Sequence, residues 1–390
     1  MAKGSTKESD YGGLFDFAVS QEEVSGFSEP ISTGSLKFDL FLGGGYRSGV
    51  ARFGAPHEHG KTMQSLTWAR EWLRKYENGE VIYIDAEGRL SEDKVEESGL
   101  TKLEKFKWAD DLKSEGNFRV VIFNVYDHIA NYFHKLILDN EKLKPKDKKR
   151  YFFVIDSLDS LIASKDLAKG FHESEQIGAA QVISAQVMKR IGAYMSKYGH
   201  HFHILSQIRA NLDINNPNSP KTKLSGGNAM LHGPSIIGQI MKDWSGTLIY
   251  PSNDTKKDPI GREHSIKFLK TFNNKTHQIL RIPIKYGHGI WLEREIIDVL
   301  LANGVMAQSG SWYSLSDIFS KELTKDYKGP DTLQTKWQGY DNIVTYLEKN
   351  SDLTKFLEAK IREVCLSVGT ERMDSEEIDE HLLSIEEDEA

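Results

Sequence analysis

Residues 49–76 contain the segment that most restricts how this chain can fold. Gly49–Gly54 is a strand-like run, residues 63–76 have the spacing of an amphipathic helix, and between them lies Ala55-Pro56-His57-Glu58-His59-Gly60-Lys61-Thr62. A strand, a tight loop and a helix in this order predict a phosphate-binding loop, in which backbone N–H groups and the helix N-terminus face the phosphates. Lys61 then neutralises the outer phosphates and Thr62 holds a magnesium ion. ATP and Mg²⁺ are therefore the expected ligands.

One position of this loop departs from the usual pattern. The glycine that normally stands four residues before Gly60 is Ala55 here, and Gly54 comes one residue too early. Alanine suits that position if its φ is negative.

Composition limits the class of protein. The chain has 390 residues, 39% of them hydrophobic, which predicts one large domain with smaller attachments. No run of about eighteen apolar residues is present and the N-terminus lacks a signal peptide, so we expect a cytoplasmic protein with no membrane contact. The single cysteine, Cys365, excludes an intramolecular disulfide and a cysteine-based zinc module. The net charge of −7 is largely due to an acidic tail at residues 374–390.

Strand-like and helix-like segments alternate along the chain. The strand-like runs are at residues 81–84, 120–123, 151–155, 202–205 and 246–250. Asp127–Asn140 and Ala180–Ser196 have helical patterns, and the basic run at 142–150 is read as solvated surface in preference to a nucleic-acid groove. This alternation predicts an α/β fold with a mostly parallel sheet. The expected domains are an N-terminal arm at 1–28, a core at 29–300, a small C-terminal α+β domain at 301–373 and the acidic tail.

Two further strands end in acids that suit a nucleotide site. The run at 151–155 is followed by Asp156 and Ser157, and Asp156 is the candidate ligand of the magnesium ion. Glu87 follows the run at 81–84 and is a candidate for orienting the attacking water. From the residues alone, Glu87 is equally well explained as an exposed acid at a strand end.

Several segments in order resemble the ATPase core of RecA-family recombinases, including the phage UvsX proteins. Besides the loop, they are Ile31–Leu36 with Asp39 and Gly43–Gly45, Ile84–Glu87, Val154–Leu158, Ser206–Arg209, Gly226–Met230, Tyr286–Ile290 and Trp312–Ser314. The matching region extends over about residues 29–350. The resemblance implies a RecA-type P-loop ATPase core.

The resemblance also implies roles for single residues. Glu87 corresponds to the catalytic glutamate, Asp156 to the magnesium-associated aspartate and Gln207 to the glutamine near the γ-phosphate. Lys270 corresponds to a lysine that acts on the nucleotide of the neighbouring protomer. Phe272 stands where a second cation is usual, and Lys267 or Lys275 are the candidates to replace it.

DNA contacts are expected from two loops and a helix. Lys189, Arg190 and Arg209 supply cations for phosphates, and Gly226, Gly227 and Asn228 supply backbone N–H groups. By resemblance, Ile177 and either Leu212 or Ile214 separate groups of stacked bases. Ile177 is explained equally well as a core residue at a helix start. No aromatic residue lies between Ile208 and Gly227, so stacking is expected to contribute less than the roughly 1–3 kcal/mol per base of an aromatic platform.

Together these features predict an ATP-dependent DNA recombinase. It would form a helical filament of identical subunits on single-stranded DNA and exchange strands with duplex DNA, with a single-stranded DNA-binding protein and loading factors as further partners. The alternative is a hexameric helicase or DNA-repair ATPase with the same core, and a non-enzymatic mediator ranks third. Phe15–Ala18 fits a motif for docking on a neighbouring subunit, although a hydrophobic anchor onto the chain's own core is the simpler interpretation.

Overall fold

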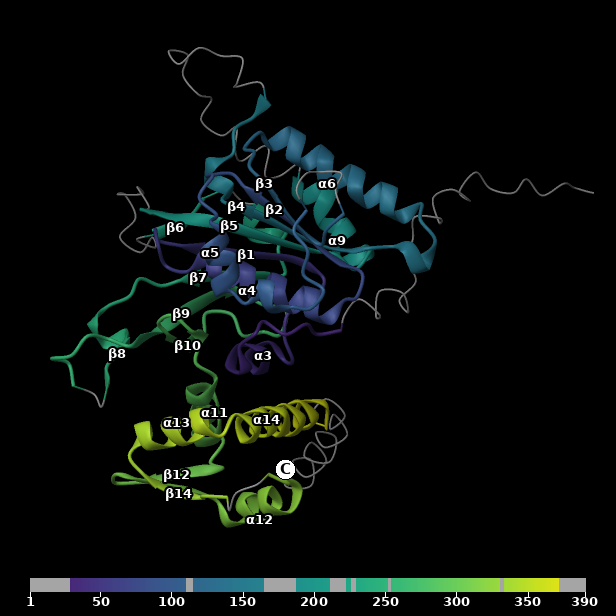
Figure 1. The fold of residues 1–390 in the computed structure, drawn as a ribbon. Helices are drawn as coiled ribbons and strands as arrows, with labels where there is room; N and C mark the ends of the chain where they lie inside the picture. The colour runs from purple at the N-terminus through teal and green to yellow at the C-terminus, as the bar shows by residue number, and fades with distance from the viewer. Residues whose placement is uncertain are drawn as a thin grey trace, which may run out of the picture.

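The computed structural model describes residues 29–109, 115–164, 187–210, 222–225, 229–251, 254–329 and 333–371. Within these residues the chain forms one large sheet and one small sheet (Figure 1). The predicted N-terminal arm and acidic tail lie outside the described residues. No helix in the described part of the chain is both long enough and apolar enough to cross a membrane.

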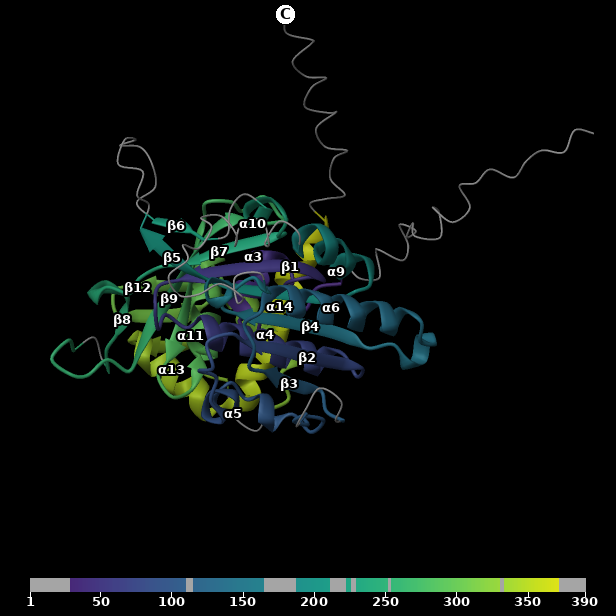
Figure 2. The ribbon, with the colours of Figure 1, turned by 90° about the horizontal axis from the view of Figure 1, so that it is seen from above.

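The large sheet has the strand order β11-β10-β9-β7-β1-β5-β4-β2-β3, with β6 paired to β5 and β8 paired to β9. The strands are β1 Gly49–Ala55, β2 Gly79–Asp85, β3 Phe118–Val121, β4 Arg150–Asp156, β5 His201–Ala210, β6 Thr222–Leu224, β7 Ile236–Ile240, β8 Leu248–Ile249, β9 Gly261–Lys270, β10 Ile279–Lys285 and β11 Gly289–Ile290. From β7 to β3 all neighbours are parallel, whereas β9, β10 and β11 are antiparallel. Figure 2 shows β1, β4, β2 and β3 following one another across the core. The predicted α/β class with a mostly parallel sheet is confirmed.

Helices cover both faces of the large sheet. They are α3 Leu36–Leu42, α4 Lys61–Lys75, α5 Glu92–Glu97, α6 Tyr126–Glu141, α9 Ala193–Lys197 and α10 Ala229–His232. On one face Trp68 of α4 packs edge-on against Phe53 of β1, and on the other Phe133 of α6 packs against Phe153 of β4. Because both faces are covered, every residue of β1 and β2 is buried. Strands buried on both sides are largely apolar, which explains the apolar run at residues 81–84 of β2.

The C-terminal part packs around a second hydrophobic cluster, which runs from Trp291 to Ile361 and also includes Leu36 of α3. Its elements are α11 Leu292–Ala302, β12 Met306–Ser309, β13 Trp312–Leu315, α12 Asp317–Asp326, β14 Lys336–Gln338, α13 Tyr340–Lys349 and α14 Ser351–Glu371. Polar contacts join it to the core: Arg362 of α14 donates to the fully buried Asp39 at 2.7 Å, and the backbone N–H of Leu36 donates to Glu295 of α11 at 2.8 Å. Figure 1 accordingly shows α3 next to the C-terminal helices.

Some predicted elements need correction. Residues 246–250 were expected to form a strand, but Ser245–Thr247 is a 3₁₀ turn and only Leu248–Ile249 pairs, antiparallel to β9. Thr247 closes this turn, because its backbone N–H donates to the carbonyl of Trp244 at 2.8 Å. The described part of the predicted helix 180–196 begins with a π-helical turn, Met188–Gly192, before α9. The basic run at 142–150 contains a 3₁₀ turn at Pro145–Asp147.

Candidate nucleotide site

The loop after β1 has the backbone that a phosphate-binding loop requires. Strand β1 ends at Ala55 and α4 starts at Lys61, so the five residues 56–60 form the turn. Gly60 has a φ of 84° and Glu58 a φ of 61°, whereas Ala55 has a negative φ. Glycine adopts positive φ without strain, and alanine is acceptable where φ is negative. The replacement of the usual first glycine by Ala55 is therefore compatible with the loop.

Thr62 and Asp156 meet at the start of α4. The Thr62 hydroxyl donates to Oδ2 of Asp156 at 2.7 Å, and the hydroxyl of Tyr83 donates to the same oxygen at 2.7 Å. Burial raises the pKa of Asp156, and the two hydrogen bonds act against that increase. Mg²⁺ is usually held by one or two protein oxygens together with phosphate oxygens, and this hydroxyl–carboxylate pair fits that requirement.

Glu87 is fixed beside this pair as an ionised carboxylate. Its Oε1 accepts from the hydroxyls of Ser157 at 2.8 Å and Ser160 at 3.2 Å, and its Oε2 lies 3.3 Å from Arg89. Burial alone would raise the pKa of Glu87, but the two hydroxyl hydrogen bonds and the charges of Arg89 and Lys61 outweigh burial and lower it. A negatively charged, oriented carboxylate of this kind can accept a hydrogen bond from a water molecule.

Gln207 lies opposite the start of the loop. It pairs in register with Ala55 across β1 and β5, and its backbone N–H donates to Oδ2 of Asp159 at 2.6 Å.

A cavity of about 420 Å³ brings the predicted nucleotide-site residues together. Its lining includes His57, Glu58, His59, Gly60, Lys61, Thr62, Glu87, Asp156 and Gln207. Ala55, Pro56 and Ser157 are outside the lining, although Lys61 donates to the carbonyl of Pro56 at 3.4 Å.

The sequence reasoning missed several residues that hold this site. Tyr83 bonds Asp156, Ser160 bonds Glu87, and Arg89 contacts both Glu87 and the ring of His57, the latter at 3.1 Å. Arg89 follows Glu87 by two residues and was within reach of sequence reasoning. In the sequence, Tyr83 is only one member of the apolar run 81–84, and nothing there indicates a role for its hydroxyl.

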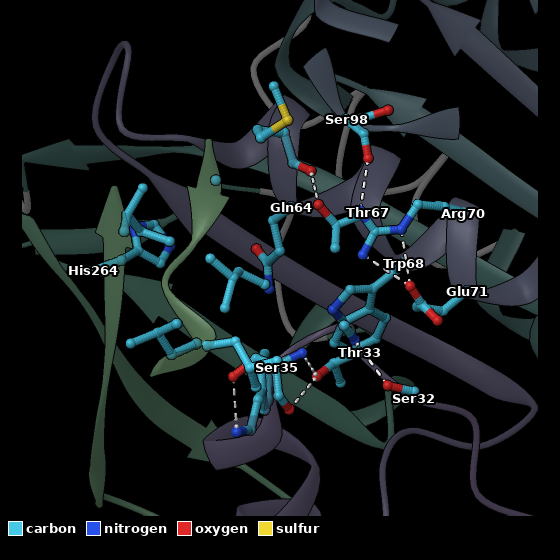
Figure 3. A pocket seen from close by; sticks show the side chains of 18 of the residues that line it. Ser32, Thr33, Ser35, Gln64, Thr67, Trp68, Arg70, Glu71, Ser98 and His264 are labelled. Atoms are coloured by element: carbon cyan, nitrogen blue, oxygen red, sulfur yellow. Dashed lines mark hydrogen bonds and ion pairs between the residues drawn. The ribbon is translucent and has the colours of Figure 1, made fainter. Parts of the chain in front are cut away.

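A second cavity adjoins the first at the start of α4 (Figure 3). It encloses about 330 Å³ between α4, residues 32–38 and strands β9 and β10. Gln64 points into it, and His264 lies on the β9 side. The paired Arg70 and Glu71, whose charged atoms are 2.8 Å apart, form part of its wall. Because Lys61, Thr62, Asp156 and Glu87 all line the first cavity, nucleotide chemistry belongs there.

Lys270 lies far from the phosphate loop of its own chain. A Cβ placed on Gly60 would be 3.4 Å from Arg262 and from His264, so the loop lies beside the start of β9. Lys270 follows His264 by six residues in the same strand, which is about 20 Å at roughly 3.3 Å per residue. Its ammonium donates to the carbonyl of His232 at 2.6 Å. Phe272 is covered by the guanidinium of Arg47, 4.4 Å from the ring centre.

Most of the predicted DNA contacts fall on residues that the structure does not describe. Outside the described residues are Ile177, Leu212, Ile214, Gly226, Gly227 and Asn228. Only backbone positions are described for Lys189 and Arg190, in the π-helical turn, and for Arg209, in β5. These assignments remain predictions.

The fold and the site together define a P-loop protein of the α/β class. Over 356 residues the chain is 24% identical to Protein RecA of Campylobacter hominis, covering 91% of this chain and 88% of that protein. It is 26% identical to Protein RecA of a Synechococcus species over 348 residues, covering 88% and 79%, and 24% identical to Protein RecA of Borreliella afzelii over 336 residues, covering 86% and 80%. No family model matches the chain. The chain is thus similar over most of its length to curated RecA proteins of several bacteria.

Proposed function

We propose that the protein is an ATP-dependent DNA recombinase, which assembles as a helical filament on single-stranded DNA and catalyses homologous pairing and strand exchange. The observation that carries this proposal is the meeting of Lys61, Thr62, Asp156, Glu87 and Gln207 in one cavity of a RecA-family chain. The family relationship supports the DNA-binding and self-assembling roles, and the cavity supports ATP hydrolysis.

Each of these side chains has a defined task in the proposed reaction. Lys61 provides positive charge for the outer phosphates, and Thr62 and Asp156 would hold Mg²⁺, which neutralises charge developing on the phosphate oxygens. Glu87 orients the attacking water and accepts a hydrogen bond from it. Gln207 is both a donor and an acceptor, so it can respond to the presence of the γ-phosphate. Because β5 continues from Gln207 into the segment 208–227, which is predicted to bind DNA, such a response would reach the DNA.

The position of Lys270 supports an action on the neighbouring subunit. About 20 Å of strand separates Lys270 from His264 beside its own loop, and its ammonium is bonded to the carbonyl of His232 and does not line the nucleotide cavity. The half-buried Lys270 is instead available to an adjoining protomer. Arg47, stacked on Phe272, places a second cation on the same edge of the core.

The proposal is tested by electron microscopy of the full chain with single-stranded DNA and a slowly hydrolysed ATP analogue. We expect helical filaments that are absent without nucleotide. Closed rings would instead favour the hexameric helicase or repair ATPase, and single particles without assembly would contradict both.

Lys270→Ala is expected to reduce DNA-stimulated ATP hydrolysis at least roughly tenfold, because one cation that stabilises charge on the transferred phosphoryl group is lost. Nucleotide affinity of the unassembled protein should remain unchanged, since Lys270 is remote from its own loop. Steady-state hydrolysis with and without DNA and nucleotide titration of the free protein measure these two effects.

A mixing experiment separates action in trans from a local structural effect. The Lys270→Ala variant keeps an intact phosphate loop, and the Lys61→Ala variant keeps Lys270. Filaments of the mixture therefore contain some interfaces at which both groups are present. Turnover of the mixture should exceed the sum of the two separate variants. Additive turnover at every mixing ratio would argue against a role for Lys270 on the neighbour's nucleotide.

A further inference from the structure

Arg52 is a fully buried arginine in the strand that leads into the phosphate loop. Its Nε donates to the hydroxyl of Ser206 at 3.3 Å, its Nη1 to the carbonyl of Met230 at 3.1 Å and its Nη2 to the carbonyl of Ser225. Burial lowers the pKa of Arg52 to about 10 while the charge of Asp159 acts in the opposite direction, so the guanidinium stays protonated at neutral pH. A buried charge is costly unless it is well paired, and here it is paired mainly with backbone carbonyls.

The three acceptors belong to segments with different roles in the proposed function. Ser225 and Met230 stand on either side of residues 226–228, to which the sequence assigns backbone contacts with DNA. Ser206 directly precedes Gln207, which lines the nucleotide cavity. One side chain in β1 therefore contacts the residues on both sides of the predicted DNA-binding segment 226–228 and the residue next to Gln207.

A close packing contact links the same two regions independently. A Cβ placed on Gly54 would lie 2.1 Å from Cδ2 of Leu224, a buried residue at the end of β6. Strand β6 pairs antiparallel with β5, so the chain returns from the loop directly onto the last residues of β1. The glycine that stands one place early for the phosphate loop thus provides room for Leu224.

A chain of hydrogen bonds continues from Gln207 to the catalytic carboxylate. The backbone N–H of Gln207 donates to Asp159, which lies in the 3₁₀ turn Leu158–Ser160. Ser160 of the same turn donates to Glu87. Hydrogen bonds therefore connect Gln207 to the turn that holds Glu87, and its neighbour Ser206 to Arg52 and so to Ser225 and Met230.

We propose that Arg52 is a positioning residue that couples nucleotide binding to DNA binding. It does so by fixing the positions of Ser225 and Met230 relative to Ser206 and the end of β1. This inference rests on the proposed function, because it assumes that ATP tightens DNA binding. The inference makes Arg52, in the middle of β1, one of the residues that link nucleotide binding to DNA binding.

Arg52→Lys tests the proposal in the full chain. Lysine keeps the positive charge, but its compact ammonium cannot reproduce the planar fork that reaches three acceptors. The measured quantity is the ratio of the single-stranded DNA Kd without nucleotide to the Kd with a slowly hydrolysed ATP analogue. This ratio should fall at least roughly tenfold, the size of a typical coupling between sites. Nucleotide affinity, titrated separately, should change less than about threefold, because Arg52 does not line the cavity.

Arg119→Lys is the matched control. Arg119 is also buried in the large sheet, in β3, and is paired with Glu80. Its replacement should lower the melting temperature but leave the DNA-binding ratio unchanged. A ratio for Arg52→Lys within about twofold of the parent, or an equal loss for Arg119→Lys, would overturn the proposal.

Ser206→Ala decides the question if Arg52→Lys does not fold. This variant removes only the acceptor of the Arg52 Nε and should lower the DNA-binding ratio severalfold. An unchanged ratio would overturn the coupling role.

The DNA-binding ratio of the parent chain is measured first. If nucleotide does not tighten its DNA binding, the proposed function fails together with the inference, whereas a failure confined to the variants refutes the inference alone.

Discussion

Glu87→Gln is expected to bind ATP with an affinity close to that of the parent protein and to hydrolyse it roughly 100-fold or more slowly. The amide oxygen can still accept the hydrogen bonds from Ser157 and Ser160, so the side chain should keep its position. It is a far poorer proton acceptor than a carboxylate, and loss of such a group typically costs about 10²- to 10⁴-fold in rate. Filaments formed with ATP should consequently persist longer. Single-turnover hydrolysis with single-stranded DNA and an equilibrium nucleotide titration measure the two properties.

Lys61→Ala provides the contrast for this experiment. It removes the charge that holds the outer phosphates, so nucleotide affinity and ATP-dependent DNA binding should be lost together. Hydrolysis by Glu87→Gln at the parent rate would mean that Glu87 is only an acid at a strand end, the alternative that the residues alone left open.

The phosphate loop and the acids could be predicted because their signals are local. Each lies at or just after the end of a strand-like run, and the carboxyl ends of parallel strands meet at one edge of the sheet. The register of β2 and β4 indeed pairs Asp85 with Asp156. What could not be predicted was how the acids are held, since the hydroxyl of Tyr83 reaches Asp156 over 73 sequence positions.

Arg52 shows the limit of sequence reasoning most clearly. A charged residue within a strand usually indicates a solvent-facing position, because burying an unpaired charge is expensive. The carbonyls that compensate for its burial, at Ser225 and Met230, come from segments more than 170 residues further along the chain. Strand β9 was also missed as a strand, because its sequence Gly261–Lys270 mixes charged and apolar residues. It pairs antiparallel outside the parallel core.

Buried histidines should make the protein unusually sensitive to acid. Burial lowers the pKa of His200 and His201 to about 3, of His264 to about 4, and of His203 well below its usual value. The unfolded chain therefore binds protons below about pH 6.5 that the folded chain does not, so stability is fully present above that pH and falls as the pH decreases. Glu295, whose pKa burial raises to about 7, acts in the opposite direction between about pH 7 and 4.5. The four histidines outnumber this glutamate, so the free energy of unfolding should fall on acidification below about pH 6.5.

His203→Phe isolates the contribution of one histidine. Neither ring nitrogen of His203 has a hydrogen-bond partner among the described residues, and the ring stacks on Phe53 with 5.3 Å between centres. A phenyl ring keeps this aromatic packing but cannot be protonated, so the free energy of unfolding should fall by about 1.4 kcal/mol less per pH unit below pH 6 than in the parent. Urea unfolding at pH 7, 6 and 5 measures the slopes, with the exposed His128 replaced by glutamine to control for loss of a histidine elsewhere. Overpacking by the larger ring would cost about 1–3 kcal/mol at every pH and leave the difference in slope intact. If the parent and His203→Phe lose stability in parallel on acidification, proton uptake by His203 does not contribute to the acid sensitivity.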